Sequence, residues 1–147
     1  MYHLLYLVLP CIFLLGGSIS GLFGDPCQII PQGPSDQHTT IDVQVDSGCR
    51  NGTFWWNYPQ GNIRLHFSHK DTSFFRVCLR DYVGGNIFTL YDVTSDMTIV
   101  MPSLIRDSST EVCTRVHHYE VVILFEASRY MYDMGEVAYR VQFIYPE

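Results

Sequence analysis

The sequence has no Cys-x-x-Cys pair, no His-Glu-x-x-His run, no glycine-rich phosphate loop and no nucleophile elbow. These motifs mark zinc or thioredoxin-like sites, metalloproteases, nucleotide-binding proteins and α/β-hydrolases. No paired-carboxylate signature is present, and no Ser, His and Asp are singled out as a triad by their placement. We therefore expect a protein that is not an enzyme and that uses no cofactor and no metal.

Charge is missing from the first twenty residues, which contain no Lys, Arg, Asp or Glu and are mostly apolar. Together with small residues at Ser18 and Ser20, this predicts a secretory signal peptide over residues 1–20. The alternative is an uncleaved signal anchor, because apolar residues resume at Leu22. Pro10 and the short apolar run argue against a membrane span of about 20 residues. We expect a secreted, extracellular protein with no membrane insertion after cleavage.

After residue 20, no hydrophobic stretch reaches the length of a membrane span. The nine basic and fifteen acidic residues give a net charge of −6, and the basic residues do not cluster. Such a surface disfavours nucleic acid and anionic lipid as partners. The remaining length suits one domain. We expect residues 21–40, rich in Pro, Gly, Gln and Ser, to be irregular and residues 41–147 to form the domain.

Four of the five cysteines remain once Cys11 leaves with the signal peptide. An even number of cysteines in a secreted chain predicts disulfides. Three pairings of the four are possible, and we expect the sequential one, Cys27 with Cys49 and Cys78 with Cys113. The two closed loops, of 22 and 35 residues, would each stabilise the fold by about 3 to 4 kcal/mol.

The mature chain is dominated by alternating apolar and polar residues, the period of half-buried strands. Clear examples are residues 41–46, 63–68, 75–80 and 137–145. Residues 86–93 and 98–101 are rich in β-forming residues, and the more continuous apolar run at 118–127 is typical of a central strand covered on both sides.

Turn signals separate these segments, and no amphipathic helix is evident. They are found at Pro59-Gln60-Gly61, Gly84-Gly85-Asn86, Pro102, Asp107-Ser108-Ser109 and Met134-Gly135. About eight short strands at this spacing predict an all-β antiparallel sandwich.

The stretch CRNGTFWWNYPQGNIRLHF, residues 49–67, places two adjacent tryptophans on one expected strand. Successive side chains of a strand point to opposite faces, so Trp56 and Tyr58 would share one face and Trp55 the other. One interpretation is that one face enters the core and the other tryptophan covers a rim or the Cys27–Cys49 bridge. The second is that one tryptophan stays partly exposed and anchors a partner.

Asn51-Gly52-Thr53 is the only N-glycosylation sequon in the sequence. Glycine at its centre favours a turn ahead of the strand, where the modifying enzyme can reach Asn51. We expect a glycan on Asn51 that shields the neighbouring edge.

The tryptophan stretch, followed by VCLRDYVGGNIF, resembles the amino-terminal domain of the meteorin family. The shared order is a cysteine, a W-x-Y-P-x-G segment, an alternating strand, a C-L-R and a Gly-Gly-Asn turn. Cys27 and Cys113 fall where that family has its first and fourth cysteines, and the closing segment VAYRVQFIY is similar. The resemblance covers roughly residues 25–145. The netrin-like module that follows in meteorins has no counterpart in this sequence.

The resemblance implies a CUB-like jelly-roll β-sandwich with the sequential disulfide pattern. It also implies a cytokine-like or neurotrophic protein that acts by protein–protein recognition at the cell surface. Because the netrin-like module is absent, any function of that module is not carried over.

The histidines and aspartates are the candidate metal ligands of the sequence. His66 and His69 would lie on opposite faces of a strand, as would the adjacent His117 and His118, so neither pair is preassembled for zinc. Many CUB domains bind calcium through acidic residues, and the candidates here are Asp81, Asp92 and Asp96. The Tyr-Asp motif of those domains is not matched cleanly, because Tyr91-Asp92 lies far past Cys78.

The leading hypothesis is a protein that binds an extracellular protein or cell-surface receptor through strand edges and loops. The candidate binding surface comprises Trp55, Tyr58, Asp81, Tyr82 and Asn86. One alternative is a secreted carbohydrate- or lipid-binding sandwich. Another is an antagonist that occupies a receptor without signalling.

Overall fold

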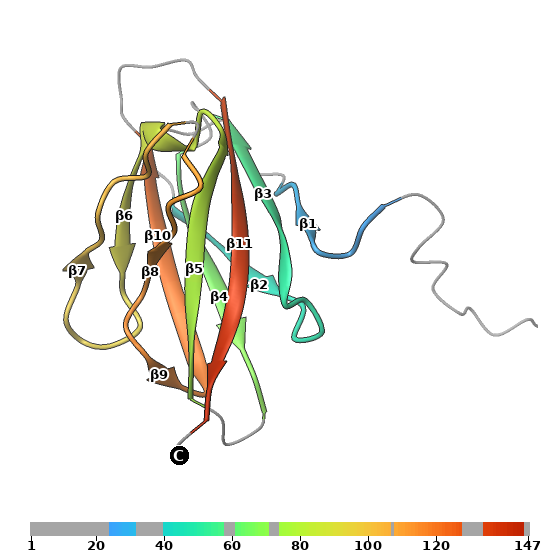
Figure 1. Ribbon diagram of the computed structural model, residues 1–147, viewed down its shortest axis with the longest axis vertical. Coiled ribbons are helices and arrows are strands. Elements are labelled where there is room, and N and C mark those ends of the chain that lie inside the picture. Colours follow the sequence, from blue (N-terminus) through green and yellow to red (C-terminus); the bar gives the residue numbers. More distant parts are fainter. Residues whose placement is uncertain are drawn as a thin grey trace, which may run out of the picture.

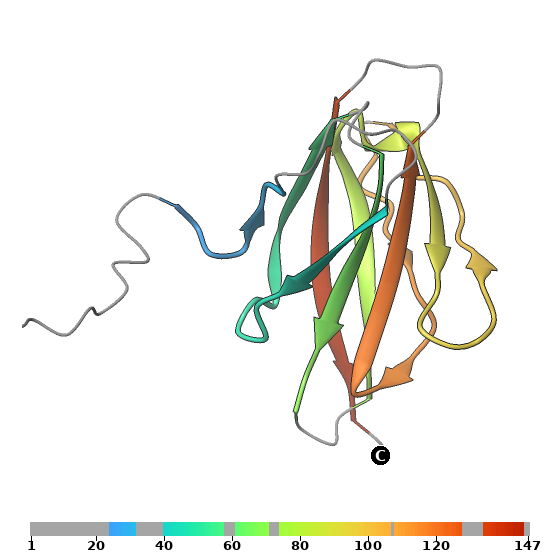
Figure 2. The same cartoon turned by 180° about the vertical axis from the view of Figure 1, so that it is seen from behind.

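The alternating segments form the strands of two packed β-sheets in a computed structural model (Figures 1 and 2). The structure describes residues 24–31, 40–57, 61–70, 74–106, 108–127 and 134–145. The expected signal peptide, Tyr58 and most of the segment expected to be irregular lie outside the described residues.

The six-stranded sheet, which faces the viewer in Figure 1, has β11 at its centre. Its order is β1-β3-β11-β5-β8, and β9 also pairs with β5. The strands are β1 (Gln28–Ile29), β3 (Asn51–Asn57), β11 (Met134–Ile144), β5 (Phe74–Val83), β8 (Val112–Cys113) and β9 (His117–His118).

The five-stranded sheet, seen in front in Figure 2, has β10 at its centre and the order β2-β4-β10-β6-β7. Its strands are β2 (Thr40–Val45), β4 (Asn62–Ser68), β10 (Glu120–Ala127), β6 (Phe88–Asp92) and β7 (Ile99–Val100). The pairing is mostly antiparallel, as expected, but β1 runs parallel to β3 and β2 parallel to β4.

The core lies between the sheets and is built by the inward residues of each alternation. On β4, Ile63, Leu65 and Phe67 are at most 2% exposed, while the intervening side chains face outward. Phe125 of β10 packs against Phe54 of β3, with 4.6 Å between ring centroids. An all-β sandwich is therefore confirmed, and the only helix among the described residues is one 3₁₀ turn, Gly85–Ile87.

Both disulfides have the sequential pairing that the sequence predicted. Cys27 is bonded to Cys49, and Cys78 to Cys113. Cys78 and Cys113 are direct partners across β5 and β8, so this bridge fixes the edge strand to the sheet. Two disulfides in a domain of this size are typical of proteins that fold outside the cytosol.

The turn predicted at Met134-Gly135 is wrong. Met134 and Gly135 begin β11, and Gly135 pairs with Trp56 of β3. Glycine is needed at this position because an added Cβ would stand 2.8 Å from the Gly84 carbonyl oxygen and 2.9 Å from the Phe88 ring. Glycine within a strand often marks such a close approach rather than a turn.

Among its described residues, the segment expected to be irregular contributes β1 and, at Thr40, the first residue of β2. Gln28 and Ile29 of β1 pair with Thr53 and Phe54, beside the Cys27–Cys49 bridge. In the part of the chain that the structure describes, no helix is long and apolar enough to cross a bilayer.

Candidate binding face on the six-stranded sheet

The two adjacent tryptophans lie on opposite sides of the six-stranded sheet, as strand alternation predicted. Trp56 is fully buried with Phe54, and its indole Nε1 donates a hydrogen bond to the Gly61 carbonyl oxygen at 2.8 Å. Trp55 points to the outer side, where it is half-buried and is the cross-strand partner of Glu136 on β11. Trp56 is therefore a core residue, and Trp55 remains available on the outer face.

Tyr82 also belongs to this outer side. It follows the same alternation on β5 as Arg80, opposite to the inward Leu79 and Asp81, and it is 56% exposed. Asn86 is exposed in the 3₁₀ turn that follows β5. Two aromatic side chains of the candidate surface thus come from two strands that flank β11.

Asp81 is not part of the binding surface, which corrects the prediction. The sequence predicted Asp81 to be part of an exposed surface, but β5 continues to Val83 and turns Asp81 inward. It is 5% exposed, and its Oδ1 accepts a hydrogen bond from the Gly85 amide. This carboxylate holds the Gly84-Gly85 turn against the end of the sandwich, a structural role.

Three arginines were not singled out by the sequence but project from the same face. Arg80 of β5 is opposite Ala138 of β11, and Arg140, two residues further along β11, is opposite Cys78. Arg76 is opposite Gln142 and donates its Nε–H to the Gln142 Oε1 at 2.8 Å. We name the outward side of β3, β11 and β5 the outer face.

A depression of about 310 Å³ lies in the middle of the outer face. Ala138 forms part of its floor, and Arg80, Arg140, Asn51 and Glu111 contribute to its lining. The methyl side chain of Ala138 leaves space between longer neighbours on adjacent strands. The result is an open site bordered by two guanidinium groups.

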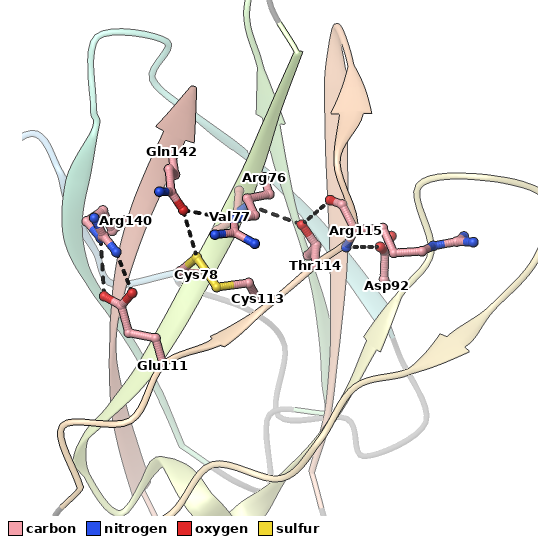
Figure 3. The surroundings of a disulfide bond; sticks show 10 residues. All are labelled: Arg76, Val77, Cys78, Asp92, Glu111, Cys113, Thr114, Arg115, Arg140 and Gln142. Atoms are coloured by element: carbon pink, nitrogen blue, oxygen red, sulfur yellow. Dashed lines mark hydrogen bonds and ion pairs between the residues drawn. A yellow bond between two sulfur atoms is a disulfide. The ribbon is translucent and has the colours of Figure 1, made fainter. Parts of the chain in front are cut away.

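Figure 3 shows the surroundings of the Cys78–Cys113 bridge, with Glu111 and Arg140 of this site beside it. Glu111 points toward Arg140, whose Nε donates to Oε1 at 3.2 Å while Nη2 donates to Oε2. The hydrogen bonds to Glu111 raise the pKa of Arg140 above its usual value. Arg140 is thus held in one orientation by a carboxylate in a two-point contact.

Asn51 stands at the edge of the same depression. The sequence predicted a turn at Asn51. In the structure, Asn51 is the first residue of β3, is the cross-strand partner of Arg140 on β11, and has an exposed side chain. A strand forms here because Gly52 lets the chain pass close to the Cys27 carbonyl and Tyr139. A glycan on Asn51 would project from the outer face itself.

A second group of charged residues lies on the outward side of the five-stranded sheet. His66 of β4 contacts Asp42 of β2 at 2.7 Å through Nε2 and Glu120 of β10 at 3.1 Å through Nδ1. Burial opposes protonation, but the hydrogen bonds to both carboxylates outweigh it and raise the pKa of His66. An open depression of about 440 Å³ adjoins it, lined partly by Arg64 and Thr94.

The other histidines and the aspartates considered for calcium each make their own contacts and do not form one site. His117 binds Asp92 at 2.8 Å, His69 packs on the Phe75 and Phe143 rings, and His118 stacks on Phe74. Asp92 also accepts hydrogen bonds from Thr94 and the Arg115 amide. Its burial works against the charged form, but the hydrogen bonds from His117 and Thr94 outweigh it and lower the pKa of Asp92.

Asp81, Asp92 and Asp96 do not form a metal-binding group among the described residues. The single group of potential ligands in that part of the chain is Cys78, Glu111 and Cys113. Its two sulfur atoms are joined as a disulfide, so they are not available as thiolate ligands.

The sequence matches no protein-family model and no curated protein. Among solved structures, it is similar to the pre-peptidase C-terminal domain of a Bacillus anthracis collagenase, with 7% identity over 71% of this chain and 95% of that one and a TM-score of 0.42. It is also similar to Aeromonas hydrophila PliG, a periplasmic inhibitor of g-type lysozyme, with 14% identity over 73% of this chain and 99% of that one and a TM-score of 0.41. Similarity at this level does not indicate what this chain binds.

Proposed function

We propose that this protein is a secreted, non-catalytic domain that binds another extracellular protein or a cell-surface receptor through the outer face. The observation that carries the proposal is the placement of Trp55, Tyr82 and Arg80 on one sheet face, on the two strands that flank β11, where no other described strand covers them. Trp, Tyr and Arg are the residues most enriched in the energetic centres of protein interfaces.

The compartment supports the same proposal. Both disulfides fit an extracellular domain. The sequential pairing also agrees with the resemblance to the amino-terminal domain of meteorins. We therefore extend the proposal to the fold and role that this resemblance implies. The chain is a CUB-like domain with a cytokine-like role at the cell surface, where it either activates or occupies its receptor.

A non-catalytic role is supported by how the titratable groups are used. Asp92 and His117, the most enclosed acid–base pair among the described residues, are bonded to one another and to backbone and hydroxyl groups. Arg140 and Glu111 are likewise paired. These contacts stabilise the fold, and the open side of the outer face offers contact area.

The test is saturable binding of the fluorescently labelled secreted protein to cells. We expect binding that is abolished by mild trypsin treatment of the cells, and that falls at least tenfold in affinity in the Trp55→Ala and Tyr82→Ala variants. Tyr145→Ala is the matched control, because Tyr145 is 73% exposed and lies beyond the end of β11.

Two results would overturn the proposal. One is binding that survives trypsin and is removed by glycosidases, which would indicate a carbohydrate ligand. The other is equal binding by the Trp55→Ala, Tyr82→Ala and Tyr145→Ala variants, which would move the interface away from the outer face.

A further inference from the structure

The outer face is locally positive although the protein is acidic. The net charge is −6, yet three of the nine basic residues, Arg76, Arg80 and Arg140, project from two adjacent strands of this face. Glu111 neutralises Arg140, and Glu136 lies further along β11 beside Trp55. Among the described residues that line the depression, Arg80 is the positive charge without a carboxylate partner.

Arg80 and Arg140 are diagonal neighbours across β5 and β11. Arg80 is opposite Ala138, and Arg140 is two residues from Ala138 on the same side of the strand. Long side chains in this diagonal relationship are within reach of one another. Two guanidinium groups therefore border the depression over Ala138, and one carboxylate serves only one of them.

The hydrogen-bond donors of the two arginines are unequally used. Arg140 uses two of its N–H groups on Glu111. No described residue forms a hydrogen bond or an ion pair with Arg80. A guanidinium carries five N–H donors in a planar fork that matches a carboxylate. The depression thus has unused donors directed by a rigid sheet.

We propose that the space between Arg80 and Arg140 binds a carboxylate side chain from an acidic segment of the partner protein. The inference rests on the proposed function and adds the chemistry of the partner. Glu111 is an example within this chain of how the site holds a carboxylate, through a two-point contact with Arg140 (Figure 3).

A protein carboxylate fits the site better than a long polyanion does. The net charge of −6 repels nucleic acids and sulfated polysaccharides at long range, whereas a single carboxylate experiences mainly the two guanidinium groups next to it. The neighbouring Trp55 and Tyr82 supply apolar contact area of the kind that proteins offer one another.

The test is a titration of the deglycosylated secreted protein with a capped tetraglutamate peptide, followed by the side-chain Nε–H resonances of arginine in NMR spectra. We expect saturable shifts of the Arg80 and Arg140 signals and no shift with capped tetraglutamine. In Arg80→Gln, affinity falls roughly tenfold, as for the loss of a hydrogen bond to a charged group.

The Glu111→Gln variant should change the affinity for tetraglutamate in the opposite direction. Removing the carboxylate that occupies Arg140 makes more donors available, so tetraglutamate should bind several-fold more tightly. Arg64→Gln is the matched control for charge, because Arg64 lies on the other sheet and pairs with Asp42. The exposed Arg80 and Glu111 are replaced without disturbing the core, and a thermal melt of each variant verifies folding.

Three outcomes contradict the carboxylate site: no saturable shift at Arg80 and Arg140, equal affinities in the Arg80→Gln and Arg64→Gln proteins, or tighter binding of a heparin disaccharide than of tetraglutamate. The cell-binding test separates this failure from failure of the proposed function. If Trp55→Ala abolishes cell binding while Arg80→Gln and Glu111→Gln do not change it, the outer face binds a protein but not through this carboxylate.

Discussion

The indole Nε1 of Trp56 donates a hydrogen bond to the carbonyl oxygen of Gly61 inside the core, across 2.8 Å. The bond joins the last part of β3 to the residue before β4, and both Trp56 and Gly61 are buried. A tryptophan with a satisfied indole N–H is well suited to such a position. The contact secures Trp56 in the core, while strand alternation places Trp55 on the outer face.

Trp56→Phe should destabilise the fold by about 1–3 kcal/mol, because it leaves a buried carbonyl without its donor and removes part of a core ring. Urea unfolding measures the change. Trp55→Phe is the control, and its half-exposed side chain should shift stability by less than about 0.5 kcal/mol. Equal losses in the two variants would show that the hydrogen bond contributes nothing specific.

Gly52 allows β1, β3 and β11 to meet. An added Cβ would stand 2.0 Å from the Cys27 carbonyl oxygen and 2.5 Å from the Tyr139 hydroxyl, and these two groups are themselves hydrogen-bonded at 2.9 Å. Burial, reinforced by Asp25 and Asp46, raises the pKa of Tyr139 to about 12, so its hydroxyl stays protonated as the donor.

Gly52→Ala should therefore cost about 1–3 kcal/mol through overpacking and should release the Cys27 end of the chain. Thermal unfolding and limited proteolysis near residues 24–31 would measure the two effects. Gly24→Ala is the matched control, because nothing lies within 4 Å of its added Cβ. A Gly52→Ala protein as stable as Gly24→Ala would refute the close approach.

The His66 cluster should make stability depend on pH. The folded-state pKa of His66 is raised above its ordinary value of 6.5, so its contribution is complete below that pH and is lost as the pH rises through the raised pKa. The hydrogen bond from His66 lowers the pKa of Asp42, so this carboxylate stays charged at pH 5.

His66→Gln should lower stability by about 0.5–1 kcal/mol at pH 5.5, a value typical of pairs with half-exposed partners, and by less at pH 8. Thermal melts of the native protein and the variant, run in parallel, separate the contribution of His66 to the pH dependence of stability from that of the other histidines. If the difference between them grew as the pH rose, the assigned direction of the pKa shift would be wrong.

Strand alternation predicted most of the fold because each strand has one buried side. Ile63, Leu65 and Phe67 of β4 are buried as expected, and the two tryptophans face opposite ways. The same rule would have placed Asp81 inward. The candidate binding surface nevertheless included it, but in the structure the Gly85 amide compensates for burying its carboxylate.

The arginine site could not be derived from the sequence alone. Alternation indicates that Arg80 and Arg140 point outward, but not that they are neighbours. Their proximity depends on β11 lying between β3 and β5, a long-range pairing set by the packing of the whole sandwich. Glu111 reaches Arg140 because the Cys78–Cys113 bridge fixes β8 beside β5.

A glycan on Asn51 should weaken binding at the arginine site. Asn51 borders the depression and is the cross-strand partner of Arg140, so a sugar attached to its amide would occupy the approach to both guanidinium groups. Enzymatic removal of the glycan should increase tetraglutamate affinity several-fold, and the Asn51→Gln protein should bind like the deglycosylated one and not respond to the enzyme. Equal affinity before and after deglycosylation, with occupancy of Asn51 verified by mass spectrometry, would mean that the glycan points away from the outer face and that Asn51 modification and partner binding are independent.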